Sequence, residues 1–136
     1  MRRSNLFIIP VLFGYISFAQ AIEGLKDCEP LYSDHPEKAK KYVQCLDLNI
    51  ELLKTTEQTW FQKLLLDIQK IQEDTGNTQL LPIIQRSARN QSNYLDDTCR
   101  WRYLHKMPNP TKAAIAFKRC EITLRKQNIE TLMMPY

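Results

Sequence analysis

The sequence predicts an all-α protein: a long antiparallel helical hairpin plus a third helix, stapled by two disulfides. Apolar residues recur in steps of three and four over most of the chain, which is the period of a helix with one buried face. Few β-branched residues alternate with polar ones, so we do not expect a sheet. Gly76 and the stretch Met107–Pro110 are strong helix breakers. They divide the pattern into three helical segments.

The N-terminal 21 residues have the organisation of a signal peptide. Met1–Arg3 is positively charged, Leu6–Phe18 is apolar, and Ala19–Ala21 is a small-x-small cleavage site. The apolar run is too short to span a bilayer, although an uncleaved signal-anchor is the alternative. We therefore expect a signal peptide over 1–21 and a single helical, disulfide-bonded domain over 22–136. The expected location is the periplasm or the extracellular space.

The first helix is expected between Glu37 and Thr75, where neither Gly nor Pro occurs. Ser33 or Asp34 can cap it, with Pro36 in the first turn. Gly76 marks its end. Unbroken, it would be about 55–60 Å long, so a bend near 45–49 is a second possibility. Its apolar stripe contains Ala39, Tyr42, Val43, Leu46, Ile50, Leu53, Trp60, Leu64, Ile68 and Ile71.

Two further helices follow. The second begins near Gln79–Pro82 and ends at Met107–Pro110, where two prolines prevent continuation. Thr111 is expected to cap the third. The stripe of the second contains Leu81, Ile84, Ala88, Leu95, Cys99 and Tyr103, and that of the third contains Ala113, Phe117, Cys120, Leu124 and Leu132.

The cysteines predict disulfides rather than a metal site. An exported chain with an even number of cysteines is typically oxidised. Zinc is the competing interpretation, but no Cys-x-x-Cys occurs, and His35 and His105 have no ligand spacing. We expect no metal and no cofactor. The four cysteines are Cys28, Cys45, Cys99 and Cys120.

The geometry of a helical hairpin selects one of the three possible disulfide pairings of the four cysteines. Residues equidistant from a turn face one another, and the midpoint of Cys99 and Cys120 falls inside the Pro-Asn-Pro turn. The midpoint of Cys28 and Cys45 falls inside the turn before Pro36. A Cys45–Cys99 bridge would be displaced by roughly 12 Å along the long hairpin, beyond the reach of a disulfide. The geometry predicts Cys28–Cys45 and Cys99–Cys120, each adding about 3 kcal/mol.

Charge and motifs argue against nucleic acid binding and catalysis. Without Arg2 and Arg3 the chain has 17 Lys/Arg and 15 Asp/Glu, a net charge of +2. Residues 22–75 carry −4 and residues 76–136 carry +6, which leaves one basic face possible. No phosphate-binding loop, nucleophile elbow or zinc-protease motif occurs, so we expect a protein that is not an enzyme. Glu57, on the apolar seam, is either a general acid in a pocket or a carboxylate reaching solvent from the helix edge.

One local cluster has binding chemistry. Cations and rigid rings are frequent in interface hot spots, and they gather near the end of the second helix. The alternative is that the cations complement the helix dipole while the rings pack on neighbouring helices. The cluster would wrap the helix end rather than form one flat patch. The candidate partner-binding residues are Arg100, Trp101, Arg102, Tyr103 and Lys106.

The segments around the cysteines resemble a known family. They are Asp27-Cys28, the run Cys45-Leu-Asp-Leu-Asn continuing to Trp60, the run Gln91–Cys99, and the run Cys120–Arg125. Together they are similar to the LprI-like lysozyme-inhibitor family (the DUF1311 type) of small exported bacterial proteins, over nearly all of Asp27–Thr131. The resemblance implies an exported binding protein that inhibits a lysozyme or another cell-wall hydrolase. The alternative is an envelope or secreted protein–protein interaction module with a basic C-terminal half.

Overall fold

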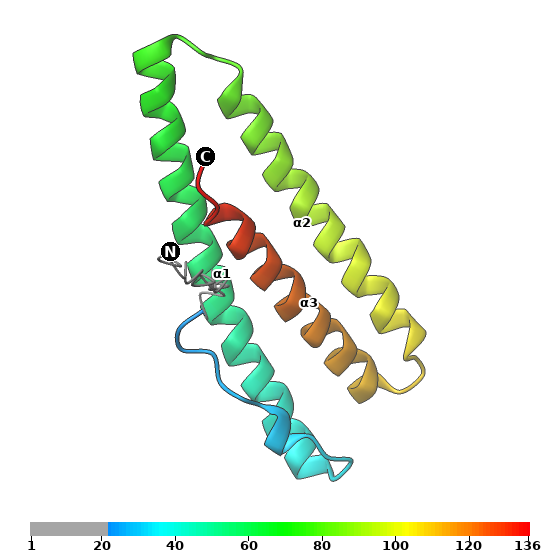
Figure 1. Cartoon of the computed structure of the whole chain (residues 1–136). Helices are drawn as coiled ribbons and strands as arrows, with labels where there is room; N and C mark the ends of the chain where they lie inside the picture. Colours follow the sequence, from blue (N-terminus) through cyan, green and yellow to red (C-terminus); the bar gives the residue numbers. More distant parts are fainter. Residues whose placement is uncertain (1–21) are drawn as a thin grey trace, which may run out of the picture.

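The computed structural model describes residues 22–136, and the predicted signal peptide lies outside the described residues. The described chain consists of a short 3₁₀ helix, η1 (Glu29–Leu31), followed by α1 (Pro36–Thr75), α2 (Leu80–His105) and α3 (Pro110–Leu132). No strand occurs among residues 22–136. The prediction of an all-α fold is confirmed. Figure 1 shows α1 as one continuous helix, without a break at 45–49.

The helix ends follow the breakers, but two predicted caps were wrong. His35, rather than Ser33 or Asp34, occupies the N-cap of α1, and Pro36 takes the first helical position. Asn109, rather than Thr111, caps α3, and its side-chain oxygen accepts a hydrogen bond from the Lys112 backbone N–H at 2.9 Å. Pro110 can stand directly after that cap because the first helical position needs no N–H donor.

The C-terminal end of α1 is as predicted. Gly76 adopts a left-handed conformation with φ 71°, and its N–H donates to the Gln72 carbonyl at 2.8 Å. A residue without a Cβ accepts this conformation at little cost. The chain therefore reverses into α2 within a few residues.

The two long helices, α1 and α2, are antiparallel, but they do not pack against each other along their length. α3 lies between them and packs against both, whereas α1 and α2 contact each other little. Figure 1 shows the two arms diverging from the loop that joins them, with the C-terminus near α1. The apolar faces of α1 and α2 thus pack mainly against α3 rather than against each other. This arrangement leaves space between the arms.

Both predicted disulfides are present. The Cα atoms are 5.8 Å apart in Cys28–Cys45 and 5.5 Å apart in Cys99–Cys120. Each bridge is part of a small apolar cluster. The first cluster contains Cys28, Tyr42, Cys45, Leu46 and Ile115, and the second contains Cys99, Cys120 and Leu124.

The three helices are not equally anchored. α1 and α3 bury several residues each, whereas Cys99 is the single buried residue of α2. Ion pairs also join α3 to the first part of the chain, through Lys118 with Asp47 and Arg119 with Glu29. The position of α2 therefore depends strongly on the Cys99–Cys120 bridge.

Candidate functional site

The predicted binding residues lie on the end of α2 that the second disulfide fixes to α3. Cys99 is fully buried, and the residues after it complete the last turns of α2. A helix end linked covalently to its neighbour has little freedom to reorient. Any partner contact made here would need little further ordering.

The residues of this cluster differ in exposure, and a cation and a ring among them are stacked together. Trp101 is 55% exposed, whereas Arg102 and Tyr103 are half-buried. The Arg102 guanidinium lies 4.3 Å from the Trp101 ring centroid and donates to the Thr98 carbonyl at 2.9 Å. Trp101 therefore does not pack into a neighbouring helix.

Exposed cations surround the turn between α2 and α3. A hollow of about 920 Å³ lies between the start of α1 and the start of α3. Asp34 and Arg119 also line it, and Arg119 is paired with Glu29 at 2.8 Å. Lys40, Lys106 and Lys112 line this hollow, and Arg100 and Arg102 precede Lys106 on α2. We call these five residues the basic end, and none of them has an ion-pair partner in the described chain.

A second concave site, which the sequence did not reveal, lies between the diverging arms. Its volume is about 790 Å³, within the usual range for ligand pockets. The C-terminal residues close one side of it, where the Tyr136 hydroxyl donates to Asp67 at 2.7 Å. The apolar walls consist of Phe61, Leu64, Ile84, Ala88, Leu95, Leu132, Met134 and Pro135.

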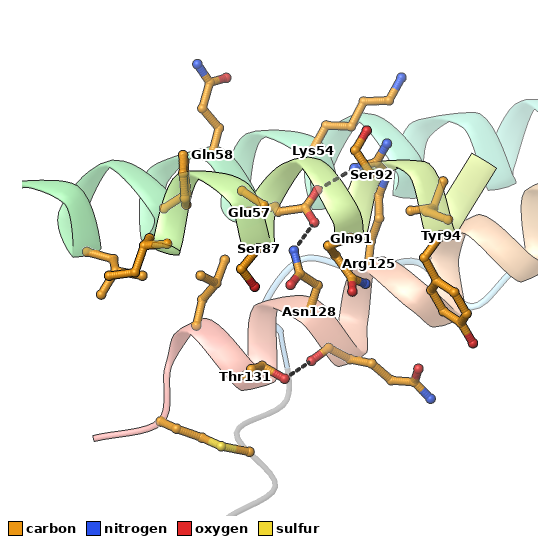
Figure 2. Close-up of a pocket in the computed structure, with 18 of the residues that line it drawn as sticks. Lys54, Glu57, Gln58, Ser87, Gln91, Ser92, Tyr94, Arg125, Asn128 and Thr131 are labelled. Atoms are coloured by element: carbon orange, nitrogen blue, oxygen red, sulfur yellow. Dashed lines mark hydrogen bonds and ion pairs between the residues drawn. The ribbon is translucent and has the colours of Figure 1, made fainter. Parts of the chain in front are cut away.

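A charged network forms the base of this groove (Figure 2). Arg125 pairs with Glu57 from α1. It also pairs, at 2.8 Å, with Glu121 one turn away on α3. Asn128 donates a further hydrogen bond to Glu57. Glu57 lines the groove, and its carboxylate is held between α1 and α3 rather than reaching solvent from the helix edge. The sequence does not identify Arg125 as a site residue, because its partner Glu57 lies 68 residues away.

A third polar cluster holds the N-terminal segment on α1 and α3. The buried Tyr42 hydroxyl donates to Glu29 at 3.0 Å and accepts from Arg119. Burial raises the pKa of Tyr42, which the hydrogen bond from Arg119 partly offsets. Asn49 makes two backbone hydrogen bonds to Lys26, of 2.8 and 2.9 Å. These groups are structural, because each satisfies another group of the chain.

The described residues do not assemble a metal site. Among residues 22–136, no group of three or more His, Cys, Asp and Glu side chains could hold a metal ion. None of the described helices combines the length and the apolar character needed to cross a membrane. Comparison of the chain with models of protein families, with curated proteins and with solved structures finds no match in any of the three.

Proposed function

We propose that this protein is an exported, non-enzymatic binding protein whose basic end binds an acidic site on a protein partner, and that the partner is a lysozyme-type cell-wall hydrolase. One observation carries the proposal. Lys40, Lys106 and Lys112, which belong to α1, the end of α2 and α3, line one hollow, and no cation of the basic end has an ion-pair partner in the described chain.

The chemistry of the partner fits this surface. Lysozyme-type hydrolases work with carboxylates in a cleft. A rigid helix end that carries several cations can enter such a cleft and interact with those carboxylates. Trp101 and Tyr103 add rigid aromatic surface at low entropic cost. The resemblance to the LprI-like family supports the same partner class.

Export is supported by two independent features. Residues 1–21 have the pattern of a signal peptide. The two disulfides and the absence of free cysteines in the described chain are compatible with an oxidising compartment. An inhibitor of a cell-wall hydrolase would act in such a compartment.

A lysis assay tests the proposal. The oxidised protein is mixed with lysozymes, and the clearing of a cell-wall suspension is followed with time. We expect slower clearing, and at least a tenfold weaker effect for Arg102→Glu/Lys106→Glu, because two attractive contacts become repulsive. Lys70→Glu is the matched control, because Lys70 is exposed near the opposite end of α1.

Full clearing at excess protein would remove the hydrolase as partner. A pull-down from envelope extract, compared between the native chain and Arg102→Glu/Lys106→Glu, then tests the broader interaction module. Equal capture by both proteins would exclude the basic end as the binding surface.

A further inference from the structure

One side of α2, along the mouth of the groove, carries an unpartnered seam, and two of its residues, Ser87 and Tyr94, also line the groove. Its residues are spaced alternately four and three apart, which is the spacing of a coiled-coil seam. No side chain of the seam makes a hydrogen bond or ion pair in the described chain, and its four large apolar members are 53–61% exposed. We call these residues the α2 seam: Ile83, Ser87, Asn90, Tyr94, Asp97, Trp101 and Leu104.

The seam is complementary to itself when reversed. In an antiparallel helix pair, residues at the same height have a constant sum of residue numbers. Reversal about residue 92 places Ile83 opposite Trp101 and Leu104 opposite Leu80. Both apolar ends of the seam then meet apolar side chains. A surface that contacts its own copy in this way forms a closed two-fold dimer.

We propose that a second copy of this chain docks on the α2 seam, so that two α2 helices pack antiparallel over about 36 Å. In this register Asn90 lies opposite Tyr94, at the centre of the seam. Ser87 lies opposite Asp97, and polar groups therefore meet polar groups. A parallel pair is disfavoured, because it would bring each Asp97 against its own copy.

Charge complementarity supports the same register. In this register, Arg86 of the second copy lies opposite residue 98, and so about one residue along the helix from Asp97. Arg86 and Asp97 also lie on the same side of the seam. Arg100 follows Asp97 by three residues on the same helix. Each carboxylate thus lies between two guanidinium groups. Neither Arg86 nor Asp97 has an ion-pair partner within residues 22–136.

The area of the seam that a dimer would bury sets the expected affinity between the two copies. Each of the four exposed apolar side chains can bury on the order of 100 Å². Two copies supply on the order of 800 Å² from these side chains, and the flanking polar residues bring the interface near the lower limit of about 1,200 Å² for specific complexes. We expect a dimer with a dissociation constant of about 1–100 µM.

The dimer goes beyond the proposed function. It covers Trp101, against which the Arg102 guanidinium stacks at 4.3 Å, but it leaves Lys106, about 140° further around the helix, outside the seam. The two proposals can therefore fail separately. Substitutions of Arg86 and Asp97 probe the dimer and lie outside the basic end, whereas substitutions of Arg102 and Lys106 probe the partner site.

Sedimentation velocity of the oxidised chain across the micromolar range tests the dimer. Arg86→Asp and Asp97→Arg should each weaken association at least tenfold, because each creates like charges across the seam. The double variant Arg86→Asp/Asp97→Arg should restore it. Asp96→Arg is the control, because Asp96 is adjacent in sequence but points about 100° away, and it should leave the dimer intact.

Far-UV circular dichroism confirms that each variant is folded, as expected for exposed positions. A native chain that stays monomeric at all concentrations would exclude a second copy as the occupant. A dimer that persists in both single variants, or that the double variant does not restore, would overturn the antiparallel register.

Discussion

Replacing Arg125 by alanine tests the energetic role of the groove network. The change removes the cation between Glu57 and Glu121, whose side chains are only 18% and 11% exposed. Removing one partner of a buried ion pair typically costs about 3–5 kcal/mol, because a charge remains buried without compensation. Asn128 still binds Glu57, so we expect a loss of about 3 kcal/mol, near the lower end of this range.

Urea unfolding of the oxidised protein, followed by far-UV circular dichroism, measures this loss. The transition midpoint should fall while the dependence of the unfolding free energy on urea stays unchanged. The melting temperature should fall by roughly 10–20 °C. Lys54→Ala is the control, because the Lys54–Glu51 pair is exposed, with 46% and 71% of the side chains accessible. Its loss should be below about 0.5 kcal/mol.

The result that would refute this reasoning is a loss below about 1 kcal/mol for Arg125→Ala. Such a value would show that water reaches Glu57 and Glu121 well enough to replace the guanidinium. The base of the groove would then be a solvated surface, and burial would not govern the network.

Three other substitutions probe the remaining links between the helices. Cys99→Ala/Cys120→Ala should lower the unfolding free energy by about 3 kcal/mol, and hydrogen exchange should accelerate in α2 before α1, since Cys99 is the single buried residue of α2. Tyr42→Phe should flatten the alkaline fall in unfolding free energy above about pH 10, the pKa of tyrosine in the unfolded chain, measured by urea titration at each pH. Because burial raises the pKa of Tyr42, its stabilising contribution is complete below the unfolded pKa and is lost as the pH rises through the folded one. A fall that stays as steep in Tyr42→Phe would contradict this assignment. Asn49→Ala should cost about 1–3 kcal/mol and speed exchange of the Lys26 N–H; unchanged exchange at Lys26 would show that Asn49 does not anchor the segment.

The predictions from sequence succeeded where the interactions are local. Gly76 and the prolines at 108 and 110 divide the helices in the predicted places, because they act on the backbone at their own positions. The disulfide pairing was also predictable, since each bridge spans a single turn. The cap of α3 shows the limit of this reasoning. Asn109 and Thr111 are both good capping residues, and the position of Pro110 decided between them.

The candidate site was only partly predictable. The cations and rings of residues 100–106 are visible as a cluster in the sequence, although their orientation is not. The groove and its network were not predictable, because Glu57 and Arg125 come together only when α3 lies between α1 and α2. Periodicity identifies which face of a helix is apolar but not which helix will cover it.

By itself, the sequence determined the three helices, their ends within a few residues and the two disulfides, because backbone preferences and short loops control these features. The tertiary structure alone decided that α3 separates the arms, that a charged network forms the base of the resulting groove, and that the seam on α2 stays uncovered. Each of these depends on contacts between residues far apart in the chain, whose geometry is set only when the helices pack.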